Sequence, residues 1–211
     1  MTKKPETVNR EDLNRRKDSL IYKKYARVPF TGVFESFHEN GQLESRYNCK
    51  NGKEDGTWKY FHENGQLISR ENYKNGEREG LRERFYKNGQ LYFKLNYKNG
   101  KQDGLSENYH ENGQLESKGN YKDGEQEGLW EDFHDNGQLF SRGNYKNGKY
   151  IGDWKVYNKK GEDISNSFSE DFYENGQLKI RGNIKDGKLD GLWEKFYENG
   201  QVESRTKHKN G

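Results

Sequence analysis

Glycines preceded by Asn or Asp recur along this chain at a spacing that alternates between 11 and 13 residues. The first two such pairs, Asn40-Gly41 and Asn51-Gly52, return about every 24 residues almost to the end of the sequence. Asn-Gly and Asp-Gly favour two-residue hairpin turns of type I′, because both central residues of that turn need a positive φ. The spacing therefore predicts two antiparallel strands in each 24-residue unit.

A turn centred on an Asn-Gly pair also predicts which residues face each other across the hairpin. With the turn at Asn136-Gly137, Glu131 faces Arg142, and Phe133 faces Phe140. The same arithmetic places a glutamate opposite a lysine or arginine in six of seven hairpins. Opposite charges that face each other across two strands contribute about 0.2–1 kcal/mol each, so these pairs support the predicted register.

The composition argues against an ordinary globular core, since 27% of the residues are apolar, 35% are charged and the mean hydropathy is -1.50. Aromatic residues nevertheless make up 14% of the chain, and they recur at fixed places in the repeat. Short units that each bury a few aromatic side chains against their neighbours can fold without a large core. We therefore expect an all-β protein, an elongated single-sheet antiparallel β-meander of stacked 24-residue hairpin repeats.

The extent of the repeat pattern divides the chain into three segments. Residues 1–18 are charged and lack the repeat, so we expect a flexible N-terminal segment there. Residues 19–32 are expected to form capping strands, because the first strand of a repeat array leaves an open edge that needs cover. Residues 33–211 form the repeat array.

The array is irregular at residues 152–176, where the glycines Gly161 and Gly176 are 15 residues apart. A full unit would place 24 residues and two turns in this interval. Either Ser165–Ser167 makes a cramped reversal, or the last two hairpins run with their edges exchanged, and the sequence leaves both open.

The charge balance bears on the class of partner. The chain has 38 Lys and Arg against 35 Asp and Glu, a formal charge of +3, which is too even for nucleic-acid binding. Cys49 is the only cysteine, and the sequence has no signal-peptide or membrane-spanning run, so a cytoplasmic protein is expected.

Histidines that precede the Asn-Gly turns form the most prominent candidate for chemistry. Equivalent positions in successive hairpins lie about 10 Å apart, whereas zinc needs its ligands at about 2.0–2.3 Å. Tyr86, Tyr173 and Tyr197 take the same place in other repeats, which favours a structural role. The glutamates have basic residues opposite, which would lower their pKa values rather than prepare them for acid catalysis. We predict no catalytic residue, no metal site and no cofactor.

Binding of a partner is a stronger hypothesis. Ile68, Tyr92 and Phe140 occupy a column that varies between repeats, and in the predicted register each faces an aromatic residue of the preceding strand: Phe61, Phe85 and Phe133. Apolar anchors in a charged surround are typical of protein interfaces. A second candidate surface, on the opposite face, consists of Trp58, Trp154 and Trp193.

The unit from Asp123 to Gly148, "DGEQEGLWEDFHDNGQLFSRGNYKNG", closely resembles the bacterial variant of the MORN repeat, with its G-x-W-x-x-[FY]-[HY]-x-N-G-x-L core. The whole arrangement, including "VPFTG" at Val28–Gly32, is similar to the YwqK-family antitoxins of toxin–antitoxin systems. Arg82 and Ser106 depart from the repeat pattern, because they stand where Trp is usual.

This resemblance implies a non-enzymatic protein-binding scaffold, with a cognate toxin as the candidate partner. The alternative is a structural scaffold associated with membrane lipid, which we favour less. End-to-end self-association through residues 201–211 also stays open.

Overall fold

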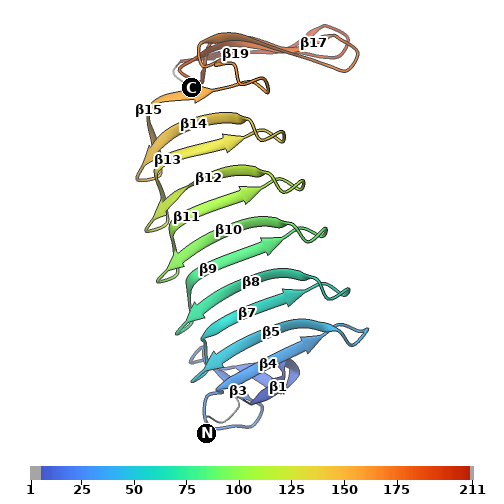
Figure 1. Cartoon of the computed structure of the whole chain (residues 1–211), viewed down its shortest axis with the longest axis vertical. Helices are drawn as coiled ribbons and strands as arrows, with labels where there is room; N and C mark the ends of the chain where they lie inside the picture. The colour runs from blue at the N-terminus through green and yellow to red at the C-terminus, as the bar shows by residue number, and fades with distance from the viewer. Residues whose placement is uncertain (1–5, 210–211) are drawn as a thin grey trace. The chain divides into compact units, whose positions relative to one another are not determined.

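The computed structural model describes residues 6–209, and nearly all of the regular structure in this range is β-strand. Two compact units can be distinguished, residues 1–125 and 126–211, and each is described by itself. The fold class predicted from the repeats is confirmed, since consecutive hairpins of antiparallel strands follow one another along the chain (Figure 1).

Unit 1 contains the N-terminal cap and the first repeats. Its strands are β1 (Thr7–Asn9), β2 (Leu13–Arg15), β3 (Ile21–Lys23), β4 (Gly32–Phe37), β5 (Leu43–Lys50), β6 (Lys53–Glu54), β7 (Gly56–Phe61), β8 (Leu67–Lys74), β9 (Glu77–Phe85), β10 (Leu91–Lys98), β11 (Lys101–Tyr109) and β12 (Leu115–Lys122), with a short 3-10 helix, η1 (Arg10–Asp12), after β1. From β4 to β12 the neighbours in the sheet follow the order of the chain, with the two-residue β6 beside β5. This is the meander that the alternating turns predict.

Unit 2 contains two sheets. Its strands are β13 (Glu125–Phe133), β14 (Leu139–Lys146), β15 (Lys149–Val156), β16 (Ser167–Phe172), β17 (Leu178–Lys185), β18 (Lys188–Phe196) and β19 (Val202–His208). Antiparallel pairing joins β13, β14 and β15, while β16 to β19 form a separate four-stranded sheet in chain order. The meander expected as one sheet is therefore interrupted between β15 and β16.

The Asn-Gly turns are of two kinds, and only one is the predicted two-residue turn. In the turn after β5, Asn51 has φ 51° and Gly52 has φ 78°, as type I′ requires. In the turn after β4, only Gly41 has a positive φ, and its N–H donates to the carbonyl of His38. Here the Asn40 side chain accepts the N–H of Gln42 at 3.0 Å. The type I′ prediction is therefore wrong for this second kind of turn.

A β-bulge compensates for the longer turn. Beyond the bulge the predicted register is confirmed, because Glu131 pairs with Arg142 and Asp132 with Ser141. Next to the turn, however, Phe133 pairs with Leu139 and not with Phe140, which is the extra residue of the bulge. The same shift recurs in the other hairpins of this kind, so the column to which Phe140 belongs consists of bulge residues.

Hydrogen bonds between hairpins tie type I′ turns to the start of the strand that follows the preceding type I′ turn. The N–H of Gly100 donates to the carbonyl of Arg78 at 3.0 Å, and the N–H of Asn99 donates to the carboxylate of Glu79 at 2.9 Å. The equivalent pairs of bonds occur at Asn75-Gly76 and, in unit 2, at Asn147-Gly148. These contacts occupy backbone donors that would face water in an isolated hairpin.

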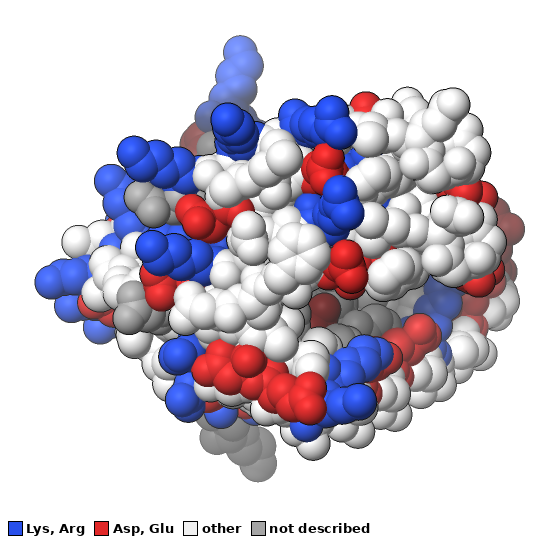
Figure 2. Space-filling model, turned by 90° about the horizontal axis from the view of Figure 1, so that it is seen from above, with Lys and Arg blue, Asp and Glu red and all other residues white. Residues whose placement is uncertain are grey.

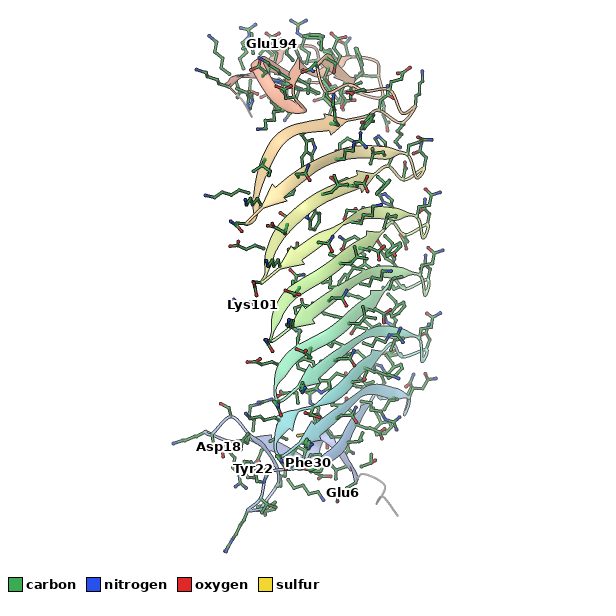
Figure 3. All side chains as sticks on the ribbon, turned by 60° about the vertical axis from the view of Figure 1, so that its left-hand side comes forward. Glu6, Asp18, Tyr22, Phe30, Lys101 and Glu194 are labelled. Carbon is green, nitrogen blue, oxygen red and sulfur yellow. The ribbon has the colours of Figure 1, made fainter. Side chains whose placement is uncertain are left out.

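The N-terminal cap begins earlier than the sequence predicts. Within the segment expected to be flexible, β1 pairs in parallel with β4 and thereby covers the first edge of the array, and β2 pairs with β3. Phe30 is buried beneath this cap with Ile21 and Cys49 (Figure 3). Residues 1–5 of the same segment lie outside the described residues.

The irregular segment turns at Ser165 and Asn166, as the first of the two alternatives predicts. The backbone of Asp163 forms an isolated β-bridge with Tyr157 before the chain enters β16. Ser165 is almost fully buried, and its hydroxyl accepts the N–H of Val156 at 2.9 Å. This hydroxyl takes the place of a backbone carbonyl that a complete next strand would supply.

Tryptophans of unit 2 lie directly on glycines of the neighbouring strand. A Cβ atom added to Gly182 would lie 2.3 Å from the ring of Trp193, and one added to Gly143 would lie 1.7 Å from the ring of Trp154. Since real Cβ atoms do not approach so closely, these glycines are needed for the indole rings to lie flat on the sheet.

Replacing Gly182 by Ala should lower the free energy of unfolding by about 1–3 kcal/mol, because the new methyl group must displace the Trp193 ring. Chemical denaturation measures this loss. In the double variant Gly182→Ala/Trp193→Ala the methyl group meets no ring, so the two losses should be clearly less than additive. Full additivity would contradict the assigned contact.

Asp163 should make the stability of the protein depend on pH in the acidic range. The Ser165 hydroxyl, the Ser165 N–H and Lys155 bind its carboxylate and lower its pKa from 3.8 to about 2. A group whose pKa is lowered by folding adds stability above its ordinary pKa and loses it as the pH falls through the folded value.

We therefore expect Asp163→Asn to be less stable than the unsubstituted chain at pH 6, with the difference shrinking between pH 3.8 and about 2. Unfolding curves recorded across this pH range measure the difference. Glu198→Gln, which removes an exposed carboxylate, serves as the control. A difference that stays constant down to pH 2 would refute the assignment.

Candidate functional site

The histidine column joins neighbouring hairpins. Nε2 of His38 lies 2.9 Å from the carbonyl oxygen of Phe61, and Nε2 of His134 lies 3.0 Å from that of Tyr157. Where tyrosine replaces histidine, the hydroxyl of Tyr86 donates to the equivalent carbonyl, 23 residues further along the chain. The two side chains are interchangeable here because each carries a hydrogen-bonding atom at the tip of a planar ring.

The charged residues in the predicted pairs form a row across several strands. In unit 1, Arg70 pairs with Glu83 of the next hairpin, although the register also places Lys94 opposite Glu83. Lys94 in turn forms an ion pair with Glu107. Each carboxylate in this row therefore has basic residues on one or both sides, an arrangement suited to strand pairing and not to proton transfer.

Cys49 is buried, and burial raises the pKa of its thiol to about 11. Since the thiolate is the reactive form, this position is unsuited to nucleophilic chemistry. Among residues 6–209, no group of three or more His, Cys, Asp or Glu side chains is placed to hold a metal ion. The described part of the chain also lacks any helix long and apolar enough to cross a membrane.

The three varying apolar residues lie at the bulges beside the turns. The structure does not place them opposite the phenylalanines as expected, because the bulge pairs Leu67, rather than Ile68, with Phe61. Tyr92 packs against the ring of Tyr86, with centroids 4.8 Å apart, and keeps 37% of its surface exposed.

Phe140 in unit 2 is 43% exposed and contacts the ring of His134 edge-on. Ile68 lines a shallow hollow of about 470 Å³ together with Phe61, His38 and His62. Their assignment to a binding surface stays a prediction.

The tryptophans of the second candidate surface are largely occupied by packing. Trp58 lies between Tyr47 and Tyr73, and its indole N–H donates to the carbonyl of Asn48. Trp193 is buried on Gly182, and its N–H donates to the carbonyl of Asn183 at 2.9 Å. Their role in partner binding also stays a prediction, and the structure gives each ring a packing role as well.

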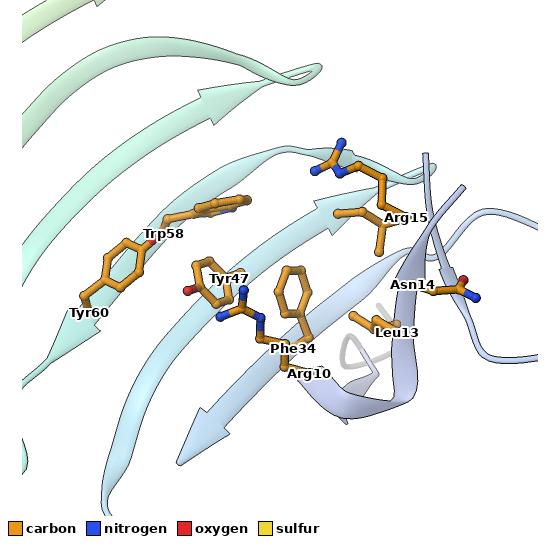
Figure 4. Close-up of a pocket in the computed structure, with 9 residues that line it drawn as sticks. Arg10, Leu13, Asn14, Arg15, Phe34, Tyr47, Trp58 and Tyr60 are labelled. Atoms are coloured by element: carbon orange, nitrogen blue, oxygen red, sulfur yellow. The ribbon is translucent and has the colours of Figure 1, made fainter. Parts of the chain in front are cut away.

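Two hollows occur on the face of unit 1 that carries Trp58. The first, of about 260 Å³, lies where the cap meets the first repeats. It is lined by the rings of Phe34, Tyr47, Trp58 and Tyr60, and Arg10 lies beside Phe34 and Tyr47 (Figure 4). Phe34 and Tyr47 stack with their centroids 4.6 Å apart. The cap strand β2 contributes Leu13 and Arg15 to its rim.

The second hollow, of about 660 Å³, lies where the tryptophan column is broken. Arg82 and Ser106 occupy the tryptophan positions, and Ser106 pairs with a glycine, Gly119, so no indole ring fills the space. Its lining also includes these side chains: Arg84, Phe93, Leu95, Tyr97, Gln102, Asn108 and Tyr121. In the sequence, this hollow is marked by Arg82 and Ser106, which stand where the repeat pattern has Trp. The first hollow could not be found in this way, because part of its lining comes from cap residues that lack the repeat pattern.

Elsewhere the charges are interspersed. On the side seen in Figure 2, acidic residues lie among the lysines and arginines, and uncharged residues cover much of the rest. The exclusion of a nucleic-acid partner, which was drawn from the near-even charge balance, stays a prediction.

A family model described as "MORN repeat variant" matches seven segments that together span well over half of the chain, at residues 30–51, 54–75, 78–99, 102–123, 126–147, 169–186 and 189–210. No match to a curated protein was found. The gap between the fifth and sixth segments contains the turn at Ser165 and Asn166, which agrees with the interruption between β15 and β16.

The structural role of the histidine column predicts that His134→Tyr keeps the free energy of unfolding within about 0.5 kcal/mol, whereas His134→Ala lowers it by about 1 kcal/mol. Tyrosine can restore the hydrogen bond to the Tyr157 carbonyl, and alanine cannot. Denaturant titration of the three proteins measures the difference. Equal losses in both variants would show that the hydrogen bond is unimportant.

Proposed function

The chain belongs to the MORN repeat variant family, and from this premise we propose that it is a non-enzymatic scaffold that binds a partner protein. Repeat arrays present side chains on a regular frame, and the positions that the frame does not use are free to determine the partner. The bulge column, which contains Ile68, Tyr92 and Phe140, is one of the columns that vary most between repeats.

One observation carries the proposal. The ring at the start of the turn makes a hydrogen bond to the next hairpin, as His38 does, and the charged column makes ion pairs, as Arg70 does with Glu83, whereas the bulge residues differ in chemistry from repeat to repeat. At three of these bulges the residue is apolar and at least partly exposed: Ile68, Tyr92 and Phe140. Exposed apolar side chains with a charged rim are what protein interfaces use as anchors.

A more specific proposal is that the partner protein is a toxin and that the chain acts as an antitoxin or immunity protein. Its support is the resemblance of the repeats and of Val28–Gly32 to YwqK-family antitoxins. Co-expression with the product of a neighbouring reading frame tests it. Rescue of growth together with formation of a stable complex is expected, and a neighbouring product that is harmless to the cell would contradict it.

A lipid-associated scaffold is the alternative. Interspersed charges of both signs and a net charge of +3 favour it less than a protein partner. Sedimentation with vesicles of anionic lipid decides between the two, because salt-sensitive binding to vesicles is expected only of the alternative.

End-to-end association is a further proposal about partners. Val202–His208 (β19) lies at the edge of the last sheet, where a strand of a second copy could pair with it. Residues 210–211, which belong to the segment expected to associate, lie outside the described residues. Light scattering over a range of protein concentrations measures whether dimers form.

The triple variant Ile68→Ser/Tyr92→Ser/Phe140→Ser should remain folded and lose partner binding by at least tenfold, because the apolar anchors are removed from exposed positions. Affinity capture from the native cell, with quantification of the retained partner by mass spectrometry, measures the loss. The matched control is Glu44→Ser/Glu116→Ser/Glu203→Ser, which alters the same bulge position in polar repeats. Equal retention by both variants would refute the site.

A further inference from the structure

The hollow lined by Trp58 and the hollow lined by Arg82 lie on one face of unit 1, and these two residues are one repeat apart. Trp58 of the first hollow pairs with Glu71, which in turn pairs with Arg82 of the second hollow. Residues in direct register across neighbouring strands point to the same face of a sheet. Two strand spacings separate Trp58 from Arg82, a distance of about 10 Å.

The first hollow is suited to an apolar side chain. Its walls are the rings of Phe34, Tyr47, Trp58 and Tyr60, and its volume is about 260 Å³. Aromatic rings offer faces and edges against which a further aromatic side chain can pack. Desolvation raises the pKa of Tyr60, so this hydroxyl stays neutral. The guanidinium carbon of Arg10, at the rim, lies 5.8 Å from the centroid of the Tyr47 ring, and its positive charge disfavours the binding of a second cation there.

The second hollow has a surplus of positive charge. Arg78, Arg82 and Arg84 all belong to β9, and the carboxylate among them is the buried Glu71. Glu71 is bound by Nε of Arg78 at 2.8 Å, and it lies 3.7 Å from Nε of Arg82. No carboxylate lines the hollow itself, whose remaining polar groups are neutral.

The neutral groups around the arginines suit a carboxylate. Ser106 and Asn108 lie on β11, two strands away from the arginines of β9, and supply further polar groups to the same hollow. Arginine binds carboxylates through two parallel hydrogen bonds, and it does so most strongly where water is partly excluded. Two arginines two residues apart on one strand place their guanidinium groups on the same face.

We propose that this face binds an extended acidic segment of a partner protein, with an apolar or aromatic side chain in the first hollow and a carboxylate at Arg82 and Arg84. An extended chain in the polyproline II conformation advances about 3.1 Å per residue and turns once every three residues, so side chains three positions apart point to the same side and span the distance between Trp58 and Arg82. The segment therefore has the form apolar-x-x-Asp or apolar-x-x-Glu. The bulge residues Ile68, Tyr92 and Phe140 line neither hollow, so this surface is separate from the one proposed above.

Selection of displayed random peptides on the full chain tests the proposal. Enriched peptides should carry an acidic residue three positions from an aromatic or aliphatic one, in either direction along the peptide. Binding of a synthetic peptide with this motif should weaken about tenfold in Arg84→Glu, since the carboxylate loses a charge-assisted partner. Arg82→Gln should weaken it as well.

Lys101→Glu is the matched control, because it makes the same change of charge at an exposed lysine that lines neither hollow (Figure 3). The bulge variant with three serines should bind the peptide normally, which separates this proposal from the first. Enriched peptides without the acidic residue, or unchanged binding by Arg84→Glu, would overturn the inference. Stronger arginine-dependent binding to single-stranded DNA or to phosphatidylserine vesicles would overturn it in favour of phosphate recognition.

Discussion

The hydrogen bonds that join one hairpin to the next are the constraint on which the rest of this structure depends. An isolated hairpin of this composition is at best marginally stable, because it buries little apolar surface. The glycine of a type I′ turn donates to a carbonyl 22 residues earlier, as Gly100 does to Arg78. At the other end of the strands, the rings of His38, Tyr86 and His134 reach a carbonyl of the next repeat. The identical residues of the repeat thus recur because every hairpin needs the same contacts.

This constraint separates the repeated residues from those that are free to vary. His134 looks like a reactive group in the sequence, yet its ring is engaged in a contact between hairpins. The residues proposed for recognition are departures from the pattern, such as Arg82 in the tryptophan column and Tyr92 at a bulge. In a repeat protein, variation between units within one chain is therefore the better guide to a binding surface.

The hairpins and their register could be predicted because Asn-Gly spacing and charge pairing are local patterns. The two kinds of turn could not be distinguished, since the same Asn-Gly pair serves both, and the bulge restores the register two residues from the turn. The cap at Thr7–Asn9 carries no repeat, so its parallel pairing with β4 depends on tertiary contacts that local patterns do not encode. The first hollow was missed for the same reason, whereas the second follows from two visible departures, Arg82 and Ser106.

Hydrogen exchange of the turn amides tests the account most directly. In a lone type I′ turn the glycine N–H faces water and exchanges rapidly. If the hairpins are held together as described, the amides of Gly76, Gly100 and Gly148 should be protected as strongly as amides in the middle of the strands, because each donates to the preceding repeat. Rapid exchange at these glycines, in a chain whose strand amides are protected, would contradict the claim that hydrogen bonds from the turn amides to the preceding repeat hold the repeats together.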